Sequence, residues 1–164
     1  MKAYLAGPDV FLADRDDRRD NLMALCSQYG ATGVWPGDIA SDVPLDIYKN
    51  CITGIEMSDI VIANISPFRG VGMDAGTAFE IGYARARNIP VFAYTESGID
   101  LYWRVLGSMT LASPQDEIVE DFGYPENLMI VHGCEGYYSN AENALAAGIQ
   151  YVIERSQRFQ SITL

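Results

Sequence analysis

Two carboxylates, Asp74 and Glu80, lie in a stretch of small residues that follows a short apolar run. The stretch reads GVGMDAGTAFEIGYARA over residues 70–86, and the apolar run DIVIANI covers residues 59–65. Such a run between turn signals predicts a strand buried on both faces, and the stretch behind it predicts a helix. In open α/β sheets, ligands bind at the carboxyl ends of the strands. We therefore expect both carboxylates in a ligand site, where small residues let a substrate approach the backbone.

Glu80 admits a structural and a chemical interpretation. The segment Thr77-Ala78-Phe79-Glu80 fits the capping box S/T-x-x-E, in which the glutamate only binds an amide at the helix start. A carboxylate in the first helical turn also faces the positive end of the helix dipole, which favours an ionised nucleophile at neutral pH. Asp74, ahead of the helix, likewise fits a turn or an N-cap position.

Two aromatic residues on predicted strands have a similar double interpretation. Residues 2–6 predict a first strand that ends at Gly7-Pro8 and carries Tyr4. Tyr4 is either a half-buried core tyrosine or the partner of a carboxylate, because a buried hydroxyl needs a hydrogen bond. Trp35 ends a second predicted strand over residues 31–35, where it either stacks on a base or covers the core.

The apolar runs predict alternating strands and helices in a single domain over residues 1–156, followed by a tail at 157–164. Strands are expected at 2–6, 31–35, 59–65 and 89–94, and helices at 12–28, from 41 or 42 onward, behind residue 74 as far as 88, and from 139 onward. This order favours an α/β fold with parallel strands. Residues 127–131 predict either a fifth strand or the start of a short helix. Residues 96–126 predict a long excursion with a short helix near 101–106.

The composition indicates a globular chain with a strongly acidic balance. Of its residues 49% are hydrophobic, and 22 acidic against 11 basic side chains give a net charge of −11. This charge argues against binding to a nucleic-acid polymer or an anionic membrane and permits a neutral or cationic small substrate. No apolar run approaches the roughly 20 residues of a transmembrane helix, and MKAYLAGPDV lacks the apolar core of a signal peptide. Scattered cysteines and a single histidine offer neither a metal site nor a disulfide framework, which favours a cytoplasmic location.

The functional groups that remain are carboxylates and hydroxyls, because the chain has no G-x-S-x-G elbow. A carboxylate nucleophile with a second acid nearby is the arrangement that displaces a leaving group from an anomeric carbon. The transition state resembles an oxocarbenium ion, which carboxylates in an acidic protein stabilise. Carbohydrate or N-glycoside chemistry is therefore expected, with neither metal nor cofactor.

Four separated segments resemble, in this order, the nucleoside 2-deoxyribosyltransferase family. They are YLAGP at residues 4–8, SDIVIA at 58–63, DAGTAFEIGYA at 74–84 and NLM at 127–129, of which the third is the most specific. The resemblance implies an α/β, flavodoxin-like three-layer sandwich with a five-stranded, mainly parallel sheet. It also implies that 2-deoxyribose moves between purine or pyrimidine bases with retention, through a covalent deoxyribosyl intermediate. The partners would then be small-molecule nucleosides and free bases.

Carried over residue by residue, the resemblance makes Glu80 the nucleophile and Asp74 the group that contacts the sugar. Tyr4 would hydrogen-bond Glu80 and hold it in position. Asn127 would reach the sugar in the site of a neighbouring subunit, which implies a homo-oligomer, a dimer or higher. The full set of expected substrate-binding residues is Ala6, Gly7, Pro8, Phe11, Trp35, Gly76, Asn127 and Met129.

The sequence departs from the family at one position of the base site. Many relatives carry an aspartate shortly before the aspartate that opens the third strand, where it handles protonation of the base. Asn50 or Cys51 occupies this region here. Either Asp38 or another acid substitutes, or the base is protonated differently.

Three other functions stay open. A hydrolase of 2′-deoxynucleoside 5′-monophosphates would use the same Glu80 with water as acceptor and would need a phosphate site, for which Arg15 and Arg69 are candidates. A flavodoxin-like binding module for FMN would need a phosphate loop rich in Ser, Thr and Gly after the first strand, and Pro8-Asp9 argues against one. A regulatory domain without activity would need only the capping-box role of Glu80.

Overall fold

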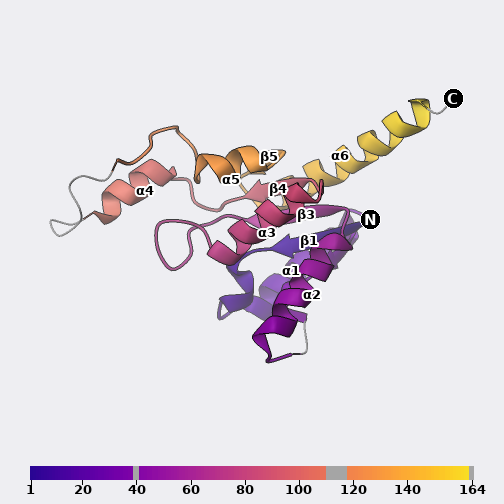
Figure 1. The fold of residues 1–164 in the computed structure, drawn as a ribbon, viewed down its shortest axis with the longest axis horizontal. Coiled ribbons are helices and arrows are strands. Elements are labelled where there is room, and N and C mark those ends of the chain that lie inside the picture. Colours follow the sequence, from indigo (N-terminus) through magenta and orange to yellow (C-terminus); the bar gives the residue numbers. More distant parts are fainter. Residues whose placement is uncertain (39–40, 110–117, 163–164) are drawn as a thin grey trace.

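The computed structural model describes residues 1–38, 41–109 and 118–162, with side chains as far as residue 158. A five-stranded sheet lies at its centre, between helices (Figure 1). The strands are β1 (Lys2–Ala6), β2 (Thr32–Val34), β3 (Ile60–Asn64), β4 (Val91–Tyr94) and β5 (Gly136–Tyr138). Their order is β2-β1-β3-β4-β5, and all four pairings are parallel. This arrangement confirms the predicted flavodoxin-like α/β fold.

Helices cover both faces of the sheet, and the strands divide their side chains between the two. The helices are α1 (Arg15–Gln28) and α6 (Ala141–Ile162) on one face, and α2 (Pro44–Glu56), α3 (Ala75–Ala86) and α5 (Leu128–Gly133) on the other. Side chains alternate along β1, so Ala3 and Leu5 join the core on the α1 face while Tyr4 and Ala6 join the core on the α3 face. Tyr4 therefore faces the helix that carries Glu80.

The fifth strand is not where the first of the two sequence alternatives placed it. Residues 128–133 form α5, and the side chain of Asn127 caps that helix by accepting a hydrogen bond of 2.9 Å from the Met129 amide. The strand that completes the sheet is Gly136–Tyr138, which pairs with β4. A short apolar run has no period long enough to separate strand from helix, and the asparagine cap decides the outcome.

The excursion after β4 contains the expected short helix, α4 (Leu101–Ser108). Residues 110–117 of the excursion lie outside the described part of the chain. At the other end, α6 extends as far as Ile162, so the segment 157–164 that was expected to be a tail begins as a continuation of this helix. Figure 1 shows α4 and the far end of α6 extending away from the sheet on opposite sides.

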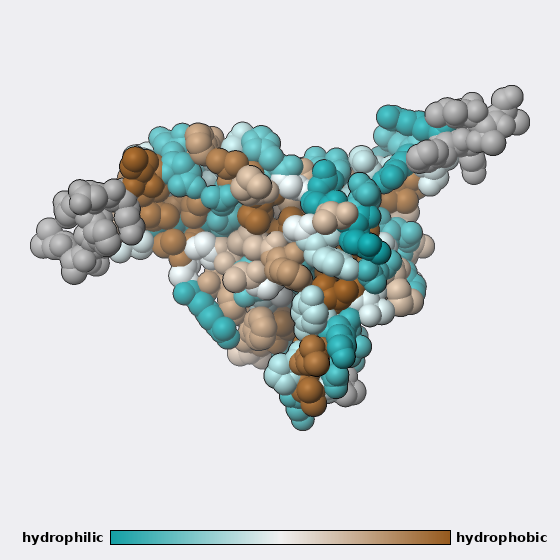
Figure 2. Space-filling view, in the orientation of Figure 1, coloured by the Kyte–Doolittle hydropathy of each residue, from teal (hydrophilic) through white to brown (hydrophobic). Residues whose placement is uncertain are grey.

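Hydrophobic surface is exposed at the start of α2 and around α4 (Figure 2). Val43 and Leu45 at the start of α2 are more than half exposed, and so is Ile99 ahead of α4. Within the described ranges, none of the helices combines the length and the hydrophobicity that a membrane span needs.

Candidate active site

A cavity of about 350 Å³ opens beyond the carboxyl end of β1. β1 lies between β2 and β3, so the chain leaves it to one side and returns on the other, and such a switch point leaves a crevice at this edge of the sheet. Loops after β1 and β2 and the helices α1, α2 and α3 all contribute to its wall. The lining residues are Gly7, Val10, Phe11, Arg15, Pro36, Gly37, Ile47, Cys51, Asp74, Gly76, Thr77 and Glu80.

A hydrogen bond joins Glu80, which lines this cavity, to Tyr4, which lies behind the lining. The Tyr4 hydroxyl donates a hydrogen bond of 2.6 Å to Oε1 of Glu80. Tyr4 is only 1% exposed, so its ring is fixed by the core and holds the carboxylate in one position. Of the two sequence interpretations of Tyr4, the structure supports both at once, because the tyrosine packs in the core and also binds a carboxylate.

Burial raises the pKa of Glu80 from its ordinary value of 4.5 to about 7. The hydrogen bond from Tyr4 lowers this pKa and the negative charge of Asp74 raises it, but both effects are smaller than the effect of burial. The positive end of the helix dipole was expected to favour the ionised form of Glu80. It does not act here, because α3 begins at Ala75 and Glu80 lies in the second turn, beyond the reach of the helix start. Glu80 is therefore a partly buried carboxyl that exchanges its proton near neutral pH.

Asp74 is the N-cap of α3, and this corrects the expected capping box. Its Oδ2 accepts a hydrogen bond of 2.9 Å from the amide of Thr77 and one of 3.0 Å from the Thr77 hydroxyl. Thr77 is thus the third residue of the helix and not its cap, so Glu80 has no capping partner. An ionised carboxylate offers about four acceptor positions, so the cap leaves capacity on Asp74 for a ligand in the cavity.

Two glycines of the wall are required for close approach. A Cβ on Gly7 would lie 2.7 Å from Oδ2 of Asp9 and 2.8 Å from Cβ of Asn64. A Cβ on Gly76 would lie 3.0 Å from Oδ2 of Asp74. Larger residues here would move the loop after β1 or the capping carboxylate, as expected of small residues beside a ligand site.

The structure brings together five of the residues expected from the sequence, Gly7, Phe11, Asp74, Gly76 and Glu80, with Tyr4 directly behind Glu80. The others lie elsewhere. Ala6 and Pro8 are buried beside the wall, and Trp35 is buried in the core on the α1 face, as one of its two interpretations stated. Asn127 caps α5, and Met129 is 74% exposed; neither lines the cavity of its own chain.

Cys51 is the residue of α2 that faces the acids. It lines the cavity, and its thiol lies against the Tyr4 hydroxyl. Burial raises the pKa of the Cys51 thiol, so this group is a neutral one. Asp38, a suggested substitute for the missing aspartate, lies outside the lining and faces Arg19 at 3.7 Å. The wall beside the acids is therefore uncharged at this point.

Sequence reasoning did not select Val10, Pro36, Gly37, Ile47 and Thr77 as site residues. Pro36 and Gly37 follow β2, and strand order alone would have indicated them, because β1 and β2 are neighbours. Ile47 lies in the first turns of α2 and carries no signal in the sequence beyond its apolar side chain.

The family model for nucleoside 2-deoxyribosyltransferases matches residues 3–129. The fold is similar to that of a 2-deoxyribosyltransferase from Leishmania mexicana, with a TM-score of 0.78 and 31% identity over 91% of this chain and 97% of that chain. It is also similar to a 2-deoxyribosyltransferase from Bacillus psychrosaccharolyticus, with a TM-score of 0.60 and 20% identity over 88% of this chain and 90% of that chain.

A further relative is an uncharacterized protein of Schizosaccharomyces pombe, 30% identical over 106 residues. That match covers 58% of this chain and only 50% of the length of the relative. The family model covers most of the chain, including the segment that carries Asp74 and Glu80. The chain therefore belongs to the nucleoside 2-deoxyribosyltransferase family.

Proposed function

We propose that this protein is a nucleoside 2-deoxyribosyltransferase, a pentosyltransferase that moves 2-deoxyribose between purine or pyrimidine bases through a covalent deoxyribosyl–Glu80 intermediate. One observation carries the proposal. The Glu80 carboxyl lines a cavity that also contains Asp74, and Tyr4 holds it in place from behind through a hydrogen bond of 2.6 Å.

The reaction has two steps. The ionised carboxylate of Glu80 attacks C1′ of the donor, the bond between C1′ and the base nitrogen breaks, and the leaving base takes up a proton from the solvent. An acceptor base then attacks C1′ from the side that the first base left, the ester bond to Glu80 breaks, and the acceptor nitrogen releases its proton to the solvent, so the exchange as a whole consumes no proton. Two inversions at one carbon give overall retention.

The charges in the cavity suit this chemistry. Positive charge develops on the sugar as the glycosidic bond breaks, and carboxylates placed beforehand in a partly dry site stabilise it without reorganising. Asp74 lies in the wall of the same cavity and is held by Thr77. Its proposed role is to bind the sugar. Phe11, Gly7 and Gly76 would border the substrate.

We propose that the protein acts as a homo-oligomer, a dimer or higher, in which Asn127 of one subunit reaches the site of its neighbour. In its own chain Asn127 does not line the cavity. Exposed hydrophobic side chains at the start of α2 and around α4 support an association surface (Figure 2).

The direct test is base exchange with deoxyinosine or thymidine as donor and adenine or cytosine as acceptor, with the products separated by chromatography. The expected result is a new deoxynucleoside with the wild-type protein and none with Glu80→Ala, while circular dichroism shows both folded. Exchange by Glu80→Ala at the wild-type rate would refute the proposal. Ribonucleosides at equal concentration test the preference for a 2-deoxy sugar, which equal turnover would exclude.

A second candidate is hydrolysis of a 2′-deoxynucleoside or its 5′-monophosphate by the same Glu80. The observation that favours it is Arg15, which lines the cavity and supplies a cation for a phosphate. Arg69 lies nearby over the ring of Phe11, 5.3 Å from its centroid. Release of free deoxyribose or its phosphate faster than base exchange, and loss of this release in Arg15→Ala, would favour the hydrolase.

A further inference from the structure

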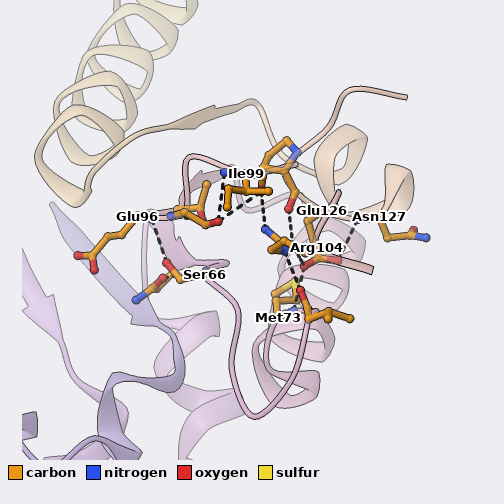
Figure 3. A network of polar contacts seen from close by, with 12 residues as sticks. Ser66, Met73, Glu96, Ile99, Arg104, Glu126 and Asn127 are labelled. Carbon is orange, nitrogen blue, oxygen red and sulfur yellow. Dashed lines mark hydrogen bonds and ion pairs between the residues drawn. The ribbon is translucent and has the colours of Figure 1, made fainter. Parts of the chain in front are cut away.

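A buried ion pair holds the loop that leads to Asp74. Arg104 of α4 and Glu126 ahead of α5 face each other at 3.3 Å, and their side chains are only 8% and 6% exposed (Figure 3). They come from opposite ends of the excursion after β4. Burying a charged side chain costs free energy unless its polar atoms all form hydrogen bonds or ion pairs. The hydrogen bonds of this pair therefore identify the segments that it holds together.

Both members of the pair bind the loop directly before Asp74. Nε of Arg104 donates a hydrogen bond of 2.8 Å to the carbonyl oxygen of Val71. Oε2 of Glu126 accepts one of 2.9 Å from the amide of Met73. Met73 is the residue that precedes Asp74, so the pair fixes the backbone from which the capping carboxylate extends (Figure 3).

The other polar atoms of the pair anchor it to the excursion. Arg104 donates to the carbonyl oxygens of Pro125, at 2.8 Å, and Ile99, at 3.0 Å. Oε1 of Glu126 accepts a hydrogen bond of 3.0 Å from the amide of Asn127. One ion pair thus ties the loop before α3 to both ends of the excursion and to the first residue before α5.

Hydrophobic contacts hold the two ends of the loop, because Phe68 stacks on Phe11 and Met73 packs against the core on the α3 face. The turn of the loop is closed by a hydrogen bond of 2.9 Å from the amide of Phe68 to the carbonyl oxygen of Gly72. A Cβ on Gly70 would meet nothing within 4 Å, and Gly72 also lacks a side chain that could pack. The backbone between these two ends, residues 70–72, therefore has no glycine side chain to fix it and is held by the hydrogen bond from Arg104 to Val71.

We propose that Arg104 and Glu126 are positioning residues of the reaction, which set the carboxylate of Asp74 relative to Glu80 and to the sugar. The inference rests on the proposed function, in which Asp74 binds the sugar. Neither member lines the cavity, so both act through Asp74. Breaking the pair lets the loop shift, which moves Asp74 away from the substrate and weakens its repulsion of the Glu80 charge.

A double-mutant cycle between Glu126→Gln and Asp74→Asn tests this action through Asp74. Asn retains the cap on α3, and Gln retains the shape of Glu126 without its charge. For base exchange we expect Glu126→Gln to lower kcat/KM by about tenfold in the wild-type background and by less than about twofold in the Asp74→Asn background. Equal losses in both backgrounds would overturn the proposal, because they would show an effect that does not pass through Asp74.

The matched control is Glu135→Gln, which breaks an Arg–Glu pair with Arg85 away from the loop. It should leave kcat/KM within about twofold of wild type. Arg104→Lys supplies a second variant if Glu126→Gln does not fold, since lysine keeps the charge but lacks the planar fork that reaches Val71 and Pro125 together. A folded Arg104→Lys with the wild-type kcat/KM would contradict the positioning role.

A readout without substrate separates this inference from the proposed function. The pKa of Glu80, followed by nuclear magnetic resonance of labelled glutamate side chains, should fall in Glu126→Gln in the same direction as in Asp74→Asn. It should stay unchanged in Glu135→Gln. If the wild-type protein exchanges no bases, the proposed function fails while this titration still tests the positioning of Asp74. An unchanged Glu80 pKa in Glu126→Gln would overturn the inference.

Discussion

At the scale of single residues, the site depends on a carboxyl group that the fold does not favour in its ionised form. Burial raises the pKa of Glu80 to about 7, and only Tyr4 opposes this with a hydrogen bond. A carboxylate with such a pKa is both available near neutral pH and basic enough to react, which is the balance that nucleophiles in active sites show. We therefore expect the ionisation of Glu80 to affect how the activity and the stability of the protein change with pH.

Changing the two neighbours of Glu80 should shift the acid side of the pH profile in opposite directions. Tyr4→Phe removes a hydrogen bond that lowers the Glu80 pKa, so the rise of kcat/KM with pH should move upward from about 7. Asp74→Asn removes a charge that raises this pKa, so the rise should move downward. The measurement is kcat/KM for the donor across pH.

A suitable control is Tyr83→Phe, which breaks another tyrosine–glutamate hydrogen bond of 2.6 Å, to Glu56, on the exposed surface. Its pH profile should match that of the wild-type protein. Shifts of Tyr4→Phe and Asp74→Asn in the same direction would contradict the assignment of the profile to Glu80.

Removing the charge of Glu80 should stabilise the fold above neutral pH. The folded pKa of about 7 exceeds the ordinary value of 4.5, so the unfolded chain loses this proton first and the folded state becomes less stable as pH rises through 7. Glu80→Gln avoids this cost and should gain up to about 3 kcal/mol well above pH 7. The gain should vanish below about pH 4.5.

Urea denaturation of both proteins at several pH values measures this difference in the free energy of unfolding. Gln still accepts the hydrogen bond from Tyr4, so packing stays the same. A Glu80→Gln protein that is less stable than wild type at pH 8 would show that the carboxylate is well solvated after all.

At the scale of elements, the residue at which α3 begins determines which side chain caps the helix and which is left for chemistry. The sequence predicted that Asp74 and Glu80 lie near the beginning of a helix, and it named Asp74 as a possible cap. It did not determine that α3 begins at Ala75, which removes Glu80 from the first turn. Local patterns leave several residues free to start a helix, and in the structure Asp74 rather than Thr77 takes the cap position.

The same limit applies to the segments after β4. The apolar residues 128–131 fit a strand as well as they fit a helix. The strand that does form, β5, has only three residues. In contrast, β1, β3 and β4 were predictable because apolar runs bounded by turn residues, almost wholly buried in the structure, allow few other structures. The raised pKa of Glu80 was not predictable, since burial is the sum of many distant contacts.

Close contacts between a helix and the sheet should matter for activity only on the α3 face. A Cβ on Gly54 of α2 would lie 3.0 Å from the Tyr4 ring, and one on Gly148 of α6 would lie 3.1 Å from the Phe92 ring. Alanine stabilises a helix by about 0.5–1 kcal/mol over glycine, which offsets part of the crowding in both. We expect Gly54→Ala to lower kcat/KM by displacing Tyr4, and Gly148→Ala to leave it unchanged.

The two glycine variants form a matched pair, because each adds a methyl group between a helix and a strand. Measuring kcat/KM and the thermal midpoint of both variants would show whether a loss of activity depends on the face of the sheet that carries the added methyl group or on the stability of the variant. Equal losses of activity in the two variants would mean that general helix displacement, and not the Tyr4 contact, limits the reaction.

At the scale of the whole molecule, each face of the sheet has a packed core, and the α3 face also carries the two acids of the cavity. The core on the other face lies under α1 and α6, while Tyr4 is part of the core on the α3 face and also reaches Glu80. Asn127 lies outside its own cavity, so its proposed role requires a second subunit. The sequence pattern indicated this residue but contained no information on where a partner would bind.

Mixing two inactive variants tests that role. Glu80→Ala and Asn127→Ala, refolded or co-expressed together, should regain base exchange, because some sites in mixed oligomers combine an intact Glu80 with an intact Asn127. Mixing Glu80→Ala with Glu80→Gln is the control, since both variants lack the Glu80 carboxylate and no repaired site can form. Activity of the first mixture no higher than that of the control mixture would exclude a shared site.

Mass spectrometry of the protein after brief incubation with a 2′-deoxynucleoside and no acceptor base tests whether Glu80 is the nucleophile. We expect a deoxyribosyl group attached to the peptide that contains Glu80 and released when a second base is added. A deoxyribosyl group on a different residue, or base exchange that proceeds undiminished in Glu80→Ala, would contradict this role of Glu80.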